Sequence, residues 1–160
     1  TASAALAGKA LAPTWLATVH GDLTFENILY LDGDVRVIDM DGADFLDAAE
    51  LDLGKMFQSL LGRYEEWAHR DGAVCEVHEG DRFEPFRVSS PDEELLRCCL
   101  GHWARVFQCS ADQVRLKGKF YMGLHFIRMV PFRMRVSEEQ ALCALVMAIQ
   151  WIGDALGELK

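Results

Sequence analysis

Short apolar runs in the first half of the chain are separated by turn residues, a pattern typical of β-hairpins. Residues 28–31 and 35–38 are rich in β-prone side chains, and the Asp-Gly-Asp sequence that joins them is a strong signal for a tight turn. Residues 73–77 and 83–88 follow a similar pattern, although Pro85 restricts the second run to a sheet edge because proline lacks a backbone N–H. The sequence therefore predicts two small hairpins.

Elsewhere the apolar residues recur every three or four positions, which predicts helices. We expect these over residues 2–11, 48–61, 91–109, 111–130 and 138–156. Ser90 and Ser137 are suitable N-caps, the second in a capping box with Gln140, and Pro131 is expected to stop or kink the helix before it. The whole pattern predicts an α+β, mostly helical fold in a single domain over residues 1–160.

Composition narrows the class of protein. A chain of 160 residues with 51% apolar content is expected to fold around a real core. The most apolar segment, residues 141–152, is too short to span a membrane, so we expect a buried helix and no membrane partner. The five cysteines are odd in number and lack the spacing of a disulfide framework. The sequence has no basic n-region followed by a small-residue cleavage site, so we do not expect secretion. Free thiols in a reducing compartment, the cytoplasm, are therefore expected.

The charge is unevenly distributed. A formal net charge of −9 argues against a nucleic-acid partner. Between Asp32 and Asp52 there are eight acids and one base, whereas six bases face one acid between Ala111 and Val136. We interpret the basic run as solvated surface. The acidic run fits a solvated surface too, but attraction of a metal ion or a cationic substrate is at least as good an explanation.

The acidic run follows a loop with a specific spacing, His20-x-Asp22-x-x-x-x-Asn27. This is the spacing of a kinase catalytic loop, in which the aspartate orients the substrate hydroxyl and the asparagine binds Mg²⁺. Gly21 leaves room around that carboxylate. Asp39 ends the second strand of the first hairpin, so the hairpin is expected to bring it back beside Asn27, where both can bind one Mg²⁺.

This stretch, continued by Ile38-Asp39-x-Asp41 and Asp52-Leu53-Gly54, resembles the aminoglycoside phosphotransferase and choline kinase-like family. The resemblance implies a protein-kinase-like fold, with Asp22 as catalytic base and Asn27 and Asp39 as Mg²⁺ ligands. It implies that His20 braces the loop, that Asp41 assists the metal or the substrate, and that Asp52 ties a helix start to the loop backbone.

The resemblance covers about residues 19–61, and the later helices agree in order with the C-terminal lobe of that family. It implies a catalytic loop and metal hairpin over residues 19–47 and a helical body over residues 48–160. About 19 residues precede His20, with no glycine-rich phosphate loop and no strand lysine. We therefore expect the N-terminal nucleotide lobe to be absent from this chain and present in a longer parent protein, so nucleotide-binding residues are not assigned.

The leading hypothesis is a phosphotransferase that uses Mg²⁺ and ATP, or another nucleoside triphosphate, to phosphorylate a small-molecule hydroxyl. The acidic run mildly favours a cationic acceptor. One alternative is a non-catalytic, pseudokinase-like module that binds a partner. A weaker one is a metal-dependent hydrolase that uses His20, Asp22, Asp39 and Asp41.

Other candidate residues have a simpler explanation of equal or greater weight. A zinc site of Cys75, His78, Cys98 and His102 lacks a C-x-x-C pair, so plain core cysteines are favoured. The segment from Tyr64 to Trp67, with its two glutamates, suits an acceptor pocket or core packing equally. Surface or core positions are favoured for the scattered histidines, which are His69, His78, His102 and His125. The late arginines around Pro131 could face phosphate, but ordinary surface charge is favoured for them, and they are Arg128, Arg133 and Arg135.

Overall fold

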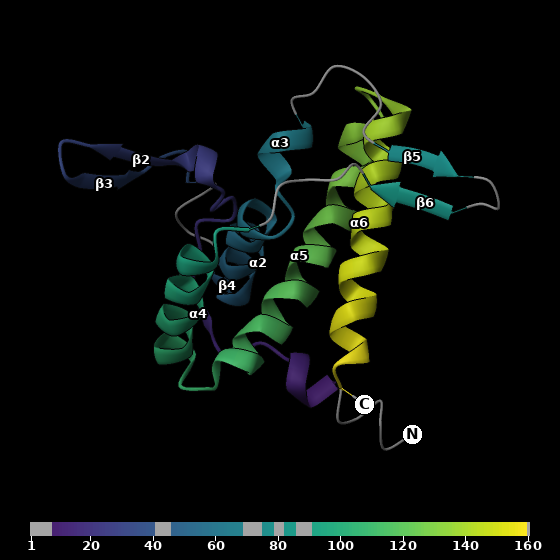
Figure 1. Cartoon of the computed structure of the whole chain (residues 1–160). Helices are drawn as coiled ribbons and strands as arrows, with labels where there is room; N and C mark the ends of the chain where they lie inside the picture. Colours follow the sequence, from purple (N-terminus) through teal and green to yellow (C-terminus); the bar gives the residue numbers. More distant parts are fainter. Residues whose placement is uncertain (1–7, 41–45, 69–74, 79–81, 86–90, 160) are drawn as a thin grey trace.

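The fold is α+β and mostly helical, as the sequence predicts (Figure 1). The computed structural model describes residues 8–40, 46–68, 75–78, 82–85 and 91–159. The helices are α2 (Glu50–Leu60), α3 (Tyr64–Ala68), α4 (Glu93–Phe107), α5 (Ala111–Arg133) and α6 (Glu138–Gly157). The strands are β1 (Leu16–Thr18), β2 (Ile28–Leu31), β3 (Asp34–Val37), β4 (Leu46–Ala48), β5 (Cys75–His78) and β6 (Arg82–Pro85). A helical stretch over residues 8–11 and a 3₁₀ turn, η1 (Phe25–Asn27), complete the described elements.

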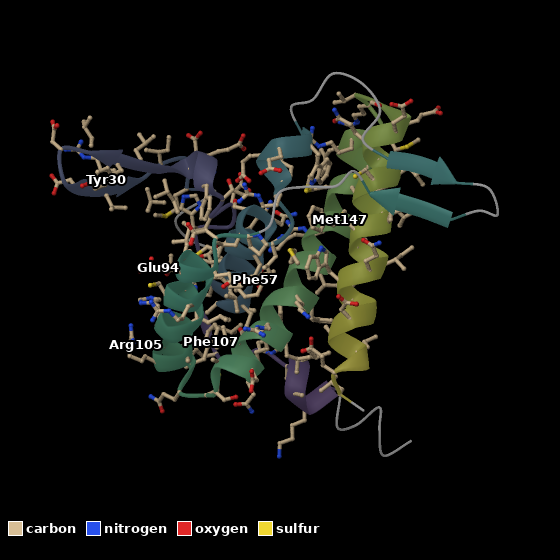
Figure 2. All side chains as sticks on the ribbon, viewed as in Figure 1. Tyr30, Phe57, Glu94, Arg105, Phe107 and Met147 are labelled. Carbon is tan, nitrogen blue, oxygen red and sulfur yellow. The ribbon has the colours of Figure 1, made fainter. Side chains whose placement is uncertain are left out.

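Helix α5 is the centre of the helical body. Helix α2 packs on one side of it and α6 on the other, while α4 packs near its N-terminal half (Figure 1). The core between these helices includes Phe57 of α2, Met122 and Phe126 of α5 and Ala148 of α6, all with no exposed side-chain surface. Figure 2 shows Phe57 inside this body and Tyr30 far from it, on the hairpin that projects to the left. The apolar residues that recur at helical spacing in the sequence thus lie on the helix faces that are buried in the core.

In the described part of the chain, three pairs of short antiparallel strands accompany the helices. The hairpins β2–β3 and β5–β6 are confirmed, with Ile28 opposite Val37 and Cys75 opposite Pro85. Asp32 and Gly33 form the first turn, both with positive φ, which is the geometry that Asp-Gly favours. The pairing of β1 with β4 was not predicted, because three-residue strands are too short to show a period.

The N-terminal caps of three helices differ from those expected. Asp92, rather than the expected Ser90, is the N-cap of α4 and accepts from the N–H of Leu95, and Ser90 lies outside the described residues. Ser137 caps α6 as expected, but Gln140 accepts from Arg133 instead of completing the capping box. A complete capping box is formed by Ser110 and Gln113 at the start of α5, a helix that the apolar spacing predicts without indicating a cap.

Pro131 does not end α5, which continues to Arg133. Of the two expected outcomes, a stop or a kink, the stop does not occur, because the hydrogen bond that proline removes is the one to the carbonyl four residues earlier, that of Ile127. Ile127 is on an exposed part of the helix, where water can replace the lost donor. The next turn is still closed by the N–H of Met134, which donates to Val130 at 2.9 Å.

Helix α6 has the expected length but is less buried than the sequence predicted. It covers 20 residues, against an expected range of 138–156, and within the described chain it is the one helix long and apolar enough to cross a membrane. Only 39% of its most apolar window is buried, and Leu145, Ile149 and Leu156 are exposed. The expectation of a buried helix therefore holds for one face only. Core helices often pass the same test of length and composition, so the finding is weak evidence for a span.

The close contact between α2 and α5 depends on Gly54. A Cβ at this position would lie 2.8 Å from the carbonyl carbon of Tyr121, a backbone atom that cannot rotate away. The two helices can therefore approach at this crossing only because residue 54 has no side chain.

We predict that Gly54→Ala lowers the free energy of unfolding by about 1–3 kcal/mol, because the methyl group forces the helices apart. Gly153→Ala in α6 is the matched control, since nothing lies within 4 Å of its added Cβ. That change should be stabilising by about 0.5–1 kcal/mol through helix propensity alone. Urea denaturation of both variants measures the difference, and equal stabilisation would contradict the close packing.

Candidate functional site

The loop that contains Asp22 is held by one carboxylate of α2. Asp52, in the first turn of that helix, accepts from the backbone N–H of His20 through Oδ2 at 2.8 Å. Its Oδ1 accepts from the N–H of Gly21 at 2.9 Å. Gly21 has a φ of 84°, a left-handed conformation that glycine adopts without strain. Asp52 thus lies where the resemblance implies, in contact with the loop backbone.

His20 connects this loop to the end of the hairpin. Its side chain is buried, and its Nε2 donates to the carbonyl of Ile38 at 2.8 Å. Its Nδ1 accepts from the N–H of Asp22 at 3.3 Å. Since a carbonyl can only accept, these two bonds require the tautomer with its proton on Nε2. The ring therefore ties Asp22 to the residue that precedes Asp39.

Asn27 lies against Asp22. Its Nδ2 donates to the main-chain oxygen of Asp22 at 2.8 Å and to the carboxylate Oδ2 at 3.2 Å. With both amide hydrogens used on Asp22, the Oδ1 of Asn27 keeps its lone pairs for another ligand. The N–H of Phe25 also donates to Ser59 Oγ at 3.0 Å, a second contact between the loop and α2.

Asp39 is next to Asn27 at the base of the hairpin. The N–H of Ile38 donates to the carbonyl of Asn27 at 3.0 Å, which extends the β2–β3 ladder by one bond. Asp39 has a φ of 54°, and its exposed carboxylate makes no hydrogen bond or ion pair with the described residues. An amide oxygen and a carboxylate suit Mg²⁺, which usually keeps waters and substrate phosphates as its other ligands.

The structure leaves one expected site residue undescribed and adds two observations on metal-type side chains. Asp41 lies outside the described residues. No group of three or more His, Cys, Asp or Glu side chains that could hold a metal occurs in the described part of the chain. The four cysteines whose side chains are described are free thiols, as predicted, and they are Cys98, Cys99, Cys109 and Cys143.

Asp22 also faces a pocket between the loop, α2 and α5. Lys55 of α2 makes an ion pair with Asp22, with its Nζ 2.8 Å from Oδ1. The carboxylate remains 45% exposed, so it is accessible from the pocket. The cavity has a volume of about 230 Å³ and is lined by Gly21, Asp22, Lys55, His125, Arg128, Met129 and Phe132.

His125 forms the buried wall of this pocket. Its Nε2 donates to the carbonyl of Leu51 at 2.8 Å, and its side chain is only 2% exposed. Burial, with a smaller contribution from the positive charge of Lys55, lowers the pKa of His125 to about 4. The ring is therefore neutral at pH 7.

The side chains of α3 make packing and hydrogen-bond contacts with other parts of the protein. Trp67 is buried and donates to the carbonyl of Gly62. Tyr64 accepts from Arg133, and Glu65 accepts from Ser59. Core packing, one of the two explanations left open for this segment, accounts for these contacts.

Lys55 and His125 were not identified as site residues from the sequence. A usable signal existed for Lys55, which is three residues after Asp52 and so lies on the same side of the helix. No signal marked His125, because its contact with Leu51 joins residues 74 positions apart.

Comparison with known proteins adds no relative: no family model, no curated protein and no solved structure matches the chain. The function must therefore be inferred from the residues of the chain and their geometry.

We predict that His125 makes the protein less stable in mild acid. The unfolded histidine, with a pKa near its ordinary value of 6.5, takes up a proton that the folded one refuses until about pH 4. The free energy of unfolding should therefore fall by up to about 3 kcal/mol between pH 7 and pH 4 from this group.

His125→Gln, which keeps a donor for Leu51, should remove this part of the pH dependence, as urea denaturation at several pH values can measure. His102→Gln is the control, because His102 is exposed on α4. An unchanged slope in His125→Gln would show that the histidine is not buried in its neutral form.

Proposed function

We propose that the chain is the catalytic C-terminal lobe of a phosphotransferase that moves the γ-phosphoryl group of a nucleoside triphosphate to a small-molecule hydroxyl. The observation that carries the proposal is the position of Asp22. Its carboxylate opens onto a pocket on one side and contacts Asn27, beside Asp39, on the other. A base and a pair of metal-type ligands are therefore adjacent, as phosphoryl transfer requires.

The chemistry assigns one task to each residue. Asp22 accepts the proton of the acceptor hydroxyl as the new bond forms between that oxygen and the γ-phosphorus. The bond from the γ-phosphorus to the bridging oxygen breaks, and the nucleoside diphosphate leaves. Mg²⁺, held by Asn27 and Asp39, would neutralise charge on the phosphates.

The neighbours of Asp22 orient its carboxylate for this role. Lys55 donates to Oδ1 and Asn27 to Oδ2, so the carboxylate plane is held from both sides. Each carboxylate oxygen keeps a further lone pair for a substrate hydroxyl. Preorganised contacts of this kind lower the cost of reaching the reactive geometry.

The hairpin favours a second candidate, a non-catalytic module that binds a partner. Its apolar side chains are exposed, including Tyr30 at 75%, Val35 at 65% and Leu31 at 62%. The hairpin projects from the body, with Tyr30 far out on it (Figure 2). An exposed apolar surface of this kind is typical of a binding site. This apolar surface suits contact with the base of a bound nucleotide if the chain is a phosphotransferase. It suits contact with a protein partner if the chain is a binding module.

We predict that Asp22→Asn lowers kcat for phosphoryl transfer by roughly 10²–10⁴-fold, because the amide cannot accept the proton. The affinity for Mg-ATP should change little. The assay is release of the nucleoside diphosphate from Mg-ATP with a panel of alcohols, sugars and their derivatives, using the protein expressed from its own gene. Asp154→Asn, an exposed aspartate on α6, is the charge-matched control.

Calorimetry separates the two candidates. The phosphotransferase should bind Mg-ATP, and Asp39→Ala should weaken that binding. Failure of the wild type to bind Mg-ATP, or an Asp22→Asn variant as active as the wild type, would leave the binding module as the better account.

A further inference from the structure

The pocket beside Asp22 is basic, although it adjoins the most acidic stretch of the sequence. Two cationic side chains, those of Lys55 and Arg128, line it together with one carboxylate, that of Asp22. His125 adds no charge at neutral pH, because burial lowers its pKa to about 4. The remaining lining is Gly21, Met129 and Phe132, which carry no charged group. The formal charge of the lining is therefore positive.

Four acids of the stretch from Asp32 to Asp52 are engaged elsewhere or lie away from the pocket. Asp52 accepts from two backbone N–H groups. Glu50 is fully buried and pairs with Lys117 at 2.7 Å. Asp32 and Asp34 are at the tip of the projecting hairpin. These four acids consequently add no negative charge to the described lining of the pocket, in which Asp22 is the carboxylate.

The two cations have donors to spare. Lys55 uses one N–H on Asp22 and keeps up to two more, while its side chain is only 15% exposed. The guanidinium of Arg128 makes no hydrogen bond or ion pair with the described residues, and it presents five N–H donors in a fork that matches a phosphate or carboxylate. An arginine at the edge of a pocket, with no partner in the part of the chain that the structure describes, is suited to bind an anion.

On the basis of the proposed function, we propose that the acceptor is an anion: a small hydroxylated molecule that also carries a phosphate or a carboxylate. Arg128 binds the anionic group, Lys55 lies between that group and the base, and the hydroxyl points to Asp22. A cationic acceptor, favoured by the charge along the sequence, would meet two positive side chains here. The volume of about 230 Å³ suits a small polyol derivative better than a large substrate.

The first test measures anion binding without nucleotide, so it does not depend on catalysis. Inorganic phosphate is titrated into the protein while NMR follows the side-chain signal of Arg128 and the amide of Gly21. Saturable shifts in the millimolar range are expected. Arg128→Gln should weaken binding roughly tenfold to a hundredfold, because a charged hydrogen-bond pair is lost.

Arg115→Gln is the matched control. Arg115 is an exposed arginine of the same helix, 13 residues earlier and outside this pocket, so its loss alters net charge equally. Phosphate affinity should be unchanged in this variant. Absence of saturable shifts, equal affinity in Arg128→Gln, or equal losses in both variants would each overturn the inference, the last by showing only general charge attraction.

The second test compares glycerol, glycerol 3-phosphate, glycerate and choline as acceptors with Mg-ATP. The two anions should be preferred, and Arg128→Gln should raise their KM at least tenfold while kcat changes less. Preference for glycerol or choline, with KM unaffected in Arg128→Gln, would refute the anionic acceptor and leave phosphoryl transfer standing. Phosphate binding at Arg128 without any transfer would refute the proposed function and leave the anion site standing.

Discussion

Two backbone N–H groups share one carboxylate at the start of α2, and the geometry of the candidate site depends on this contact. Asp52 accepts from His20 and Gly21 at 2.8 and 2.9 Å. Hydrogen bonds to a charged group contribute roughly 1.5–3 kcal/mol each, enough to hold a loop that has no regular structure of its own. From this point the contacts continue through the ring of His20 to Ile38, so the loop, the hairpin and the helix form one connected unit.

Helix α2 combines this role with a place in the core, because its two sides differ. Asp52, Lys55 and Ser59 lie on one side and contact the backbone of the loop or the carboxylate of Asp22. Leu53, Phe57 and Leu60 lie on the other side and are buried against the helical body. Spacings of three and four residues produce both faces. Stability and site geometry are therefore coupled, since a shift of α2 against α5 also moves the Asp22 loop.

Structural features that depend on neighbouring residues in the sequence were predicted correctly. Asp32 and Gly33 specify the first hairpin turn on their own, and the apolar spacing of α2, α5 and α6 locates their core faces. The differences have two causes. Helix α5 continues past Pro131 because the carbonyl that loses its donor is on an exposed part of the helix. The strand pairing of residues 16–18 with 46–48 joins distant segments that are too short to show a period.

In the candidate site, too, residues connected by a short segment could be predicted, whereas residues brought together by folding could not. The spacing of Asp22, Asn27 and Asp39 could be read in the sequence, because a hairpin of known length connects the last two. The positive lining could not, because Lys55 and Arg128 come from helices that meet only in the folded chain. Local charge along the sequence pointed to a cationic acceptor, whereas the lining of the folded pocket contains two bases and one acid.

The most direct test of this account is hydrogen exchange at the amides of His20 and Gly21 in the wild type and in Asp52→Asn. The carboxamide can accept at only one of its two polar atoms, so at least one of these N–H groups loses its acceptor. The account predicts faster exchange at these two amides in Asp52→Asn, with little change at Met122 in the centre of α5. Unchanged protection of both loop amides would contradict it, because Asp52 would then not be what holds the Asp22 loop in place.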